Sequence, residues 1–416
     1  MGRILIVGAG AAGLMAAIHA SRAGAEVTVL EHNEKAGRKL YITGKGRCNV
    51  TNDCTVDEFL REVPRNPRFL YSALNFFGPQ DMIALLEENG CPVEVQRGRR
   101  AYPASMKASD VTKTLTGLCA RQGVRLLFHQ EVSRLWTEEN PETGRPEIRG
   151  VETGEGVRVP AEKVILATGG LSYPGTGSTG DGYRMAREAG HSVTELRPSL
   201  IGLESGADWP GELQGLSLKN VRVTLKAGRK VLYTEIGEML FTHFGFSGPL
   251  ILEASCHLPE KGEYSLELDL KPGLTGDQVD ARLRRELEAG AKKQVRNMLP
   301  ALLPGSLAEI FPRLSGLPEN LACNQVTGAQ RAALAEHLKS LPLPVRGCRP
   351  LAEAVVTRGG IPVKEVNPGT MESRIVSGLY LAGELLDVDA HTGGYNLQIA
   401  FATGALAGKS AAGEDW

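Results

Sequence analysis

Residues 4–13 read Ile-Leu-Ile-Val-Gly-Ala-Gly-Ala-Ala-Gly, and this stretch decides the fold. Four apolar residues that end at a glycine are typical of a parallel strand buried on both faces. The Ala-rich stretch 14–23 predicts a helix that ends at Gly24, and residues 27–30 predict a second buried strand. A strand, a GxGxxG turn, a helix and a strand within about 30 residues predict a Rossmann-like βαβ unit that binds a dinucleotide.

Each glycine of this turn has a physical role in such a unit. Gly8 permits the tight turn, Gly10 lets a pyrophosphate approach the backbone, and Gly13 lets the helix pack closely on the strand. The helix N-terminus then presents unpaired N–H groups to the phosphates. Glu31, 18 residues after Gly13, ends the second strand, where a carboxylate accepts hydrogen bonds from the ribose hydroxyls. The alternative is a glycine-rich turn without a ligand.

Length and composition narrow the class of protein. The 416 residues predict two or three domains, and 47 Lys and Arg against 48 Asp and Glu argue against a general nucleic-acid binder, although a local basic groove stays open. Seven cysteines without a CxxC pair predict free thiols in a reducing compartment and no metal site. No apolar run reaches the ~18 residues of a membrane span. We therefore expect a cytoplasmic protein without membrane contact, with a signal peptide at residues 3–18 as the alternative.

The hydrophobic pattern changes twice along the chain. Helical patterns cover 57–89 and 109–122, and strand-like pieces cover 124–136, 148–159 and 164–166. Alternation at 221–225 and 264–270 then predicts an antiparallel barrel or half-open sheet. The predicted division is an α/β dinucleotide domain over 1–192, a β-barrel-like insert over 193–274, a helical insert over 275–340, a return through the insert over 341–355, and the rest of the α/β domain over 356–416.

Three further segments separate FAD from NAD, which the first motif alone does not. Residues 167–170 (Ala-Thr-Gly-Gly) resemble the second glycine signature of two-dinucleotide-fold flavoproteins. Residues 378–384 (Gly-Leu-Tyr-Leu-Ala-Gly-Glu) resemble their late strand, whose end meets the ribityl chain and the pyrophosphate. Residues 393–398 (Gly-Gly-Tyr-Asn-Leu-Gln) would open a last helix with its positive end toward the flavin, where it would tune the reduction potential.

A fuller set of motifs resembles one family, the BaiN/YhiN-type flavoproteins, also called aminoacetone-oxidase-like or NAD(P)/FAD-dependent oxidoreductases. The motifs are residues 37–40, 44–52, 173–183, 241–249 and 367–373. The resemblance implies bound FAD in a Rossmann-like two-dinucleotide-fold domain with an inserted β-barrel-like domain and a small helical insert. Reduction of activated C=C bonds, including ring enones and a uracil in ribosomal RNA, is attributed to some members of the family.

The motifs and the resemblance together predict a set of cofactor contacts. Asn49 and the amides around Gly46 are expected to contact FAD, Cys48 to pack near the flavin, and the Val132 backbone to meet the adenine. The full set is Gly8, Gly10, Ala11, Ala12, Gly13, Glu31, Arg38, Lys39, Gly46, Cys48, Asn49, Val132, Ala167, Thr168, Gly169, Gly383, Glu384, Gly394, Asn396, Leu397 and Gln398.

The resemblance suggests an FAD-dependent oxidoreductase in which NAD(P)H is the transient reductant and flavin N5 passes a hydride to a small-molecule acceptor. A side chain must then supply a proton, and the candidates are His243, Tyr173 and His391, each of which has a structural role as its alternative. Three other functions stay open: an amine oxidase that uses O₂, an enzyme that converts uracil to dihydrouridine in RNA, and an FAD-binding protein without turnover. The acceptor, NADH or NADPH, and the oligomeric state are not predicted.

Several motifs have a structural interpretation beside the functional one. Residues 175–180 also spell GxGxxG, but a loop precedes them, so they predict a glycine-rich loop rather than an NAD(P)H site. Cys48 and Cys54 have five intervening residues where flavin disulfide reductases have four, which favours packing over disulfide chemistry. Residues 357–360 (Thr-Arg-Gly-Gly) are either a loop in which glycine gives the flavin ring clearance or a structural turn.

Two basic clusters stay unassigned. Arg97, Arg99 and Arg100, followed by Lys107, are either a solvated loop or a contact for an anionic substrate. The helical insert holds a second cluster of Lys292, Lys293 and Arg296, while its leucines at helical spacing predict core positions.

Overall fold

The computed structural model describes residues 2–259 and 261–413, and the chain divides into two compact units. Unit 1 holds Met1–Ser199 and Pro350–Trp416, and unit 2 holds Leu200–Arg349. The predicted borders were 192/193 and 355/356, a few residues away. The difference arises because β11 (Arg197–Ser199) pairs with β19 (Val356–Arg358), which keeps both linking strands in unit 1.

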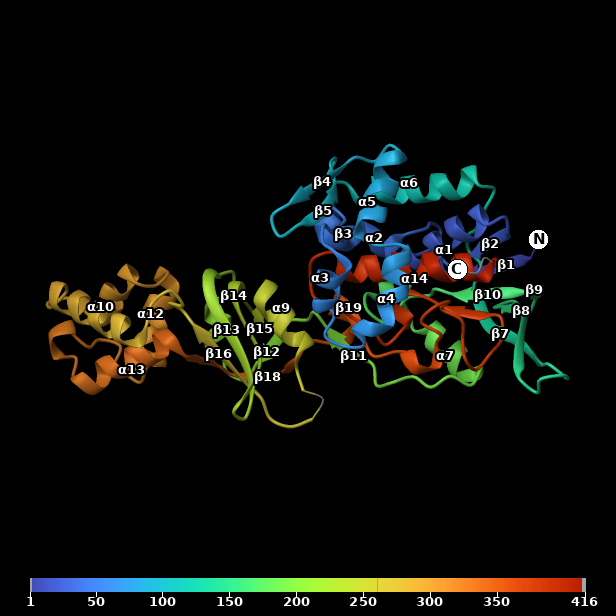
Figure 1. Ribbon diagram of the computed structural model, residues 1–416. Coiled ribbons are helices and arrows are strands. Elements are labelled where there is room, and N and C mark those ends of the chain that lie inside the picture. Colours follow the sequence, from blue (N-terminus) through green and yellow to red (C-terminus); the bar gives the residue numbers. More distant parts are fainter. Residues whose placement is uncertain (1, 260, 414–416) are drawn as a thin grey trace. The chain divides into compact units, whose positions relative to one another are not determined.

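Unit 1 is built on a parallel sheet with the strand order β20-β10-β1-β2-β6 among the described residues. The bounds are β1 Arg3–Val7, β2 Glu26–Leu30, β6 Arg125–Leu127, β10 Lys163–Leu166 and β20 Leu379–Leu381. Helix α1 (Ala11–Arg22) lies beside α14 (Tyr395–Ala411), as Figure 1 shows. The two ends of the chain therefore complete one α/β layer, which confirms the predicted Rossmann-like fold.

Two smaller antiparallel sheets complete the strands of unit 1. They are β7-β8-β9 (Val132–Glu139, Pro146–Thr153, Arg158–Pro160) and β3-β5-β4 (Thr51–Asn52, Arg100–Pro103, Val93–Gln96). The strand-like stretch 124–136 is not one strand, because the chain turns at His129 (φ 56°) and passes from β6 into β7 of another sheet.

The helical pattern of 57–89 is also interrupted. It forms α3 (Val56–Arg61), α4 (Tyr71–Phe76) and α5 (Pro79–Glu88). Pro67 follows Asn66, which has a positive φ, and opens a 3₁₀ turn that leads into α4, while Pro79 is the first residue of α5, so both prolines stand at the start of a helical segment and neither continues the one before. The other helices of this unit are α2 Arg38–Ile42, α6 Ala108–Arg121 and α7 Asp181–Glu188.

Unit 2 contains an antiparallel sheet with the order β17-β16-β13-β14-β15-β12-β18 in the described part of the chain. The bounds are β12 Leu203–Ser205, β13 Ser217–Ala227, β14 Lys230–Thr242, β15 Gly245–Ser247, β16 Ser265–Asp269, β17 Leu341–Leu343 and β18 Val345–Cys348. The first and last strands of this order are separated in sequence only by Pro344. The sheet must therefore curl until its two edges approach each other, which is a barrel-like arrangement.

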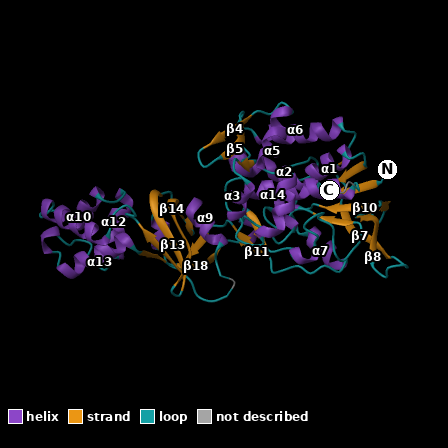
Figure 2. Ribbon diagram, viewed as in Figure 1, coloured by secondary structure: helices purple, strands orange, loops and turns teal. Residues whose placement is uncertain are grey.

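Helices gather at one end of unit 2 (Figure 2). They are α10 Gly276–Ala289, α11 Val295–Met298, α12 Gly305–Leu314 and α13 Gly328–Lys339, while α8 (Trp209–Glu212) and α9 (Pro249–Cys256) lie with the strands. Leu283, Phe311 and Leu334 are fully buried, so the apolar positions of this insert form a core. No helix within residues 2–259 or 261–413 combines the length and the apolar character that a membrane crossing requires.

Candidate functional site

The carboxyl ends of four parallel strands meet at one edge of the unit 1 sheet. Gly8 follows β1, Glu31 follows β2, Ala167 follows β10, and Ala382 follows β20. Hydrogen bonds continue the ladder into these residues, since the Gly8 N–H donates to Leu30 O (2.8 Å), the Ala167 N–H to Val7 O (2.9 Å) and the Ala382 N–H to Leu166 O (3.1 Å). This edge is where open α/β sheets bind ligands, and it brings together residues from both ends of the chain.

The glycines of the opening turn divide into two kinds. A Cβ on Gly13 would overlap the carbonyl oxygen of Gly8, and a Cβ on Gly8 (φ +100°) would lie 2.7 Å from Ala167 O. By contrast, a Cβ on Gly10 would meet nothing within 4 Å among the described residues. Gly8 and Gly13 are therefore required by the protein's own packing, whereas Gly10 leaves room in front of the α1 amides for an anionic group.

Glu31 is held beside this turn by three N–H donors. Its Oε2 accepts from the Ala9 N–H (2.7 Å), and its Oε1 accepts from the Asn33 N–H (2.9 Å) and Asn33 Nδ2 (2.6 Å). Arg38 Nη1 in turn donates to Asn33 Oδ1 (2.6 Å), so Arg38 reaches Glu31 through Asn33. The Gln130 N–H donates to the backbone carbonyl oxygen of Glu31 (2.9 Å), which places the segment leading to Val132 beside the backbone of Glu31.

Lys39 and Glu384 form an ion pair with a 2.8 Å distance between Nζ and Oε2. Glu384 Oε1 also accepts from Ser172 Oγ (2.6 Å) and from the Thr357 N–H (2.8 Å). Burial raises the pKa of Glu384, but Lys39 and these hydrogen bonds outweigh burial and hold that pKa below its ordinary value. The motifs named Lys39 and Glu384 as separate cofactor contacts and missed that Ser172 and Thr357 join them in one network.

Buried polar side-chain atoms without a hydrogen-bond partner in the described residues of unit 1 are His19 Nε2, Asn49 Oδ1, Thr51 Oγ1, Arg65 Nε, Thr168 Oγ1 and Gln398 Oε1. Three of them, on Asn49, Thr51 and Thr168, belong to the glycine-rich motifs around the sheet edge. Buried polar atoms are nearly always paired in folded proteins, so these atoms fit a site completed by a ligand. Asn49 and Thr168 were predicted from the motifs, and Thr51 was missed although it lies in the motif 44–52. Together with the open space at Gly10, these atoms fit a bound FAD.

The side chains at the start of α14 form hydrogen bonds and packing contacts within the protein. Asn396 Nδ2 donates to Ala390 O (2.7 Å), and its Oδ1 accepts from the Ala390 N–H (2.9 Å). Gln398 is fully buried, and its Nε2 donates to Phe77 O (2.9 Å). Leu397 packs partly buried against the core, and Gly394 precedes the helix with a positive φ. The helix N-terminus is thus fixed in place by neighbouring loops.

Cys48 and Cys54 are free thiols in a buried setting. Burial raises the pKa of the Cys48 thiol to about 12. Burial, and then the nearby Glu58 carboxylate, raise the pKa of Cys54 to about 11. Because the thiolate is the reactive species in disulfide exchange, both shifts favour the packing role over redox chemistry. Gly46 (φ 84°) and Cys48 (φ 58°) shape the tight loop around them.

The three candidate proton donors have different surroundings. His391 Nδ1 lies 3.0 Å from Glu62 Oε2, and the His391 N–H donates to Glu62 O (3.0 Å). Tyr173 is 39% exposed in unit 1. His243 is exposed at the turn between β14 and β15 in unit 2, with its ring 5.1 Å from that of Phe244.

Two other glycine motifs are explained by contacts within the protein. A Cβ on Gly359 would overlap Glu195 O, and a Cβ on Gly360 would lie 2.5 Å from Leu385 O. Residues 357–360 therefore need glycine as a structural turn. In the motif 175–180, a Cβ on Gly177 would overlap the Asn33 side chain, which packs this loop against the end of β2.

In the basic cluster at residues 97–107, Arg97 and Arg99 lie in the turn between β4 and β5, Arg100 begins β5, and Lys107 precedes α6. Arg99 forms an ion pair with Glu58 (2.8 Å) and is largely exposed, which fits a solvated loop.

Comparison with known proteins identifies the family. Residues 2–410 match the model described as "HI0933-like protein Rossmann domain". The chain belongs to the HI0933-like family. This membership makes the protein an FAD-binding flavoprotein of oxidoreductase type.

Two full-length relatives of this HI0933-like protein have named activities. It is 33% identical over 419 residues to the 3-dehydro-bile acid delta(4,6)-reductase of Clostridium scindens, with 99% of each chain covered. It is 31% identical to the ribosomal RNA dihydrouridine synthase of Haemophilus influenzae, with 96% of each chain covered. Among solved structures, the 3-ketosteroid delta1-dehydrogenase of Sterolibacterium denitrificans has a TM-score of 0.52 at 14% identity, with 99% of this chain and all of that chain covered, which shows a shared fold.

Proposed function

We propose that this HI0933-like protein transfers a hydride from NAD(P)H, through bound FAD, to an activated C=C bond. The acceptor gains one hydride and one proton, and NAD(P)⁺ is the oxidised product. The observation that carries the proposal is the sheet edge with its open space at Gly10 and the unpaired buried atoms of Asn49, Thr51 and Thr168, which we call the cradle. It occurs in a chain whose full-length relatives include a delta(4,6)-reductase. When bound, FAD supplies the two-electron transfer between donor and acceptor.

The residues of the cradle would divide the work of holding the cofactor. The α1 amides at Ala11 and Ala12 face the space at Gly10 and would bind the pyrophosphate. Glu31 would accept hydrogen bonds from the ribose, with Asn33 fixing its orientation. The N-terminus of α14 would present its positive end to the isoalloxazine ring.

The proton would come from one of three side chains. His391 has Glu62 as a fixed partner, and the Tyr173 and His243 side chains are exposed. We expect one of His391→Gln, Tyr173→Phe and His243→Gln to lower turnover while FAD content stays at the wild-type value. If all three variants keep wild-type turnover, the proton reaches the acceptor from another group or from water.

Anaerobic spectroscopy tests the proposed electron path. We expect NADH or NADPH to bleach the flavin absorbance of the purified protein, and a cyclic enone to restore it in stoichiometric amount. The absence of bleaching by both nucleotides would overturn the assignment of the donor. Turnover of a primary amine with O₂ and release of hydrogen peroxide would favour an amine oxidase.

A second acceptor class is a uracil in ribosomal RNA. It is favoured by the 31% identity to ribosomal RNA dihydrouridine synthases of Haemophilus influenzae and Escherichia coli. Mass spectrometry of ribosomal RNA from cells with and without the gene tests it. The loss of a dihydrouridine in the deleted strain, restored by the wild-type gene, would place the acceptor in RNA.

A further inference from the structure

A hollow of about 450 Å³ lies in unit 2 between α10, the loop before it, and the segment after α11. Its charged lining residues are Lys271, Arg282 and Arg285, and no carboxylate lines it among the described residues. Leu274 and Leu302 contribute apolar surface to its wall. We call this hollow the basic groove. Its lining combines positive charge with apolar surface, which is the composition of a site for an anion.

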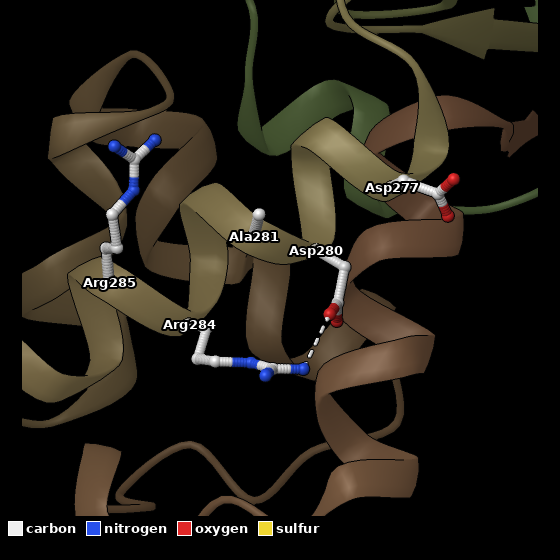
Figure 3. A pocket seen from close by; sticks show the side chains of 5 residues that line it. All are labelled: Asp277, Asp280, Ala281, Arg284 and Arg285. Atoms are coloured by element: carbon white, nitrogen blue, oxygen red, sulfur yellow. Dashed lines mark hydrogen bonds and ion pairs between the residues drawn. The ribbon is translucent and has the colours of Figure 1, made fainter.

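Asp280, an acidic residue of α10, is paired with arginines that do not line the basic groove. Asp280 accepts from Arg331 Nε (2.7 Å) and from Arg284 Nη2 (3.3 Å). Figure 3 shows Arg284 turned toward Asp280, whereas Arg285 extends away from both Asp280 and Asp277. Arg285 has no ion-pair partner in the described part of the chain. Arg285 lines both the basic groove and the neighbouring hollow drawn in Figure 3, to whose wall Asp277 and Asp280 also belong, and its unpaired charge is available to the groove.

Lys271 is crowded by a like charge. Its side chain is half-buried, and burial, followed by the nearby Arg282, lowers the pKa of Lys271. Arg282 has Glu286 as its partner (2.7 Å), while Lys271 has no ion-pair partner in the described residues. Two cations held close together beside apolar surface repel each other more strongly than they would in water. An anion between them would relieve that repulsion.

The surrounding sequence adds to the positive charge. Residues 271–302 contain seven Lys and Arg against four Asp and Glu, although the whole chain is nearly balanced at 47 against 48. Lys292, Lys293 and Arg296 follow α10 and belong to this surplus. The excess is therefore local to the helical insert.

We propose that the basic groove binds a phosphate group, carried either by a polynucleotide strand or by a small phosphorylated molecule. Guanidinium and ammonium groups are the side chains that bind phosphate oxygens by charge-assisted hydrogen bonds, and the groove supplies both. This inference goes beyond the proposed oxidoreductase activity, because it concerns binding in unit 2 and holds whether or not the flavin is reduced by NAD(P)H.

Binding to the full-length, FAD-loaded protein tests the groove. The probes are a fluorescein-labelled single-stranded RNA of twelve nucleotides, followed by anisotropy over a range of salt, and inorganic pyrophosphate, followed by calorimetry. We expect Lys271→Gln with Arg285→Gln to weaken RNA binding at least about tenfold at low salt. The slope of log affinity against log salt should fall by about 1.4, since each phosphate contact to a single strand contributes roughly 0.7.

Matched variants separate this effect from general damage. Arg284→Gln lies on the same helix but faces Asp280, so it should bind the RNA within about twofold of the wild type. Arg285→Lys keeps the charge and should retain most of the affinity. The thermal midpoint, the FAD content and the rate of flavin reduction should not change in any of these variants, so failure of the flavin chemistry would not affect the result.

The two probes distinguish the source of the phosphate. Loss of both RNA and pyrophosphate binding in the double variant supports the groove as a general phosphate site, and loss of pyrophosphate binding alone points to a small ligand. Wild-type affinity of the double variant for both probes would overturn the proposal. So would the absence of binding of both probes to the wild-type protein.

Discussion

The opening turn of unit 1 and the helical end of unit 2 use glycine differently. At the sheet edge, a Cβ on Gly13 would overlap Gly8 O. At the starts of α12 and α13, a Cβ on Gly305 or Gly328 would meet nothing within 4 Å in the described residues. Gly8 and Gly13 of the opening turn are therefore required by close backbone packing, whereas Gly305 and Gly328 of the helical end are replaceable in the folded state.

The two units also differ in how exposed their ion pairs are. Lys39 and Glu384 are 23% and 14% exposed, and Ser172 and Thr357 complete their hydrogen bonds. In unit 2, the pair formed by Lys226 and Glu267 at 2.8 Å is more exposed, at 32% and 28%. A buried carboxylate depends more on its partner than an exposed one, because water cannot replace the lost interaction. The comparison of the two units can be tested by substitution.

The largest expected effect is that of Gly13→Ala. The added methyl overlaps backbone, which cannot move aside, so the free energy of unfolding should fall by more than about 3 kcal/mol and FAD should be lost. Gly10→Ala should leave the unfolding free energy of the apoprotein unchanged but weaken FAD binding by roughly tenfold or more. Urea unfolding and the flavin-to-protein absorbance ratio measure both. Full FAD content in Gly13→Ala would contradict the role of close packing.

Lys39→Met should have the next largest effect. It leaves the Glu384 carboxylate partly buried without a cation, so the unfolding free energy should fall by about 2–3 kcal/mol. The depressed pKa of Glu384 gives stability above its unfolded-state pKa, and this contribution is lost as pH falls through the folded-state pKa. In the variant this acid dependence should shrink. Lys226→Met in unit 2 is the matched control and should cost less than about 1 kcal/mol.

Equal losses in Lys39→Met and Lys226→Met would show that burial does not distinguish the two pairs.

His19 on α1 should make the stability of unit 1 sensitive to acid. Its ring packs against Phe76 and Phe77 at 5.5 and 5.3 Å, and burial, with Arg22 and Lys409 nearby, lowers its pKa to about 4. Between about pH 6.5 and 4 the unfolded chain binds a proton that the folded chain does not. The unfolding free energy should therefore fall by about 2 kcal/mol between roughly pH 7.5 and 5.

The control for this prediction is His19→Leu, which removes the titrating group. The difference in unfolding free energy between the variant and the wild type should change with pH by that same amount. A constant difference over this pH range would mean that His19 titrates alike in the folded and the unfolded chain.

Gly328→Ala has the smallest expected effect. The methyl enters open space at the first residue of α13, so the unfolding free energy should stay equal or rise by up to about 1 kcal/mol. Thermal unfolding measures this change. A loss similar to that of Gly13→Ala would remove the distinction between the two kinds of glycine.

Some features could be predicted because they are local in sequence. The strand, turn and helix over residues 3–22 follow from apolar runs and glycine spacing, and the alternation at 221–225 predicted a strand of the antiparallel sheet. Motifs distributed along the whole chain predicted the family, and the comparison with known families confirmed it. The break of residues 57–89 into separate helices also had a local signal in Pro67 and Pro79, but the hydrophobic periodicity of the stretch predicted a continuous helical pattern.

Other features have no local signal. Gly359 and Gly360 were open to a flavin explanation, but the atoms that require them belong to Glu195 and Leu385. The stretch 124–136 contains enough apolar residues to resemble one strand, and only the pairing of its two ends with two different sheets divides it.

The amino-acid sequence by itself determined the dinucleotide turn, the α/β class and the family, because each depends on residues that are near one another along the chain or on motifs with fixed spacing. Only the tertiary structure decided that Lys39 neutralises Glu384 and that Lys271 lies near Arg282 without a carboxylate partner. Such pairings depend on which distant segments the fold brings together and on which charges it leaves uncompensated, and neither follows from the local pattern of residues.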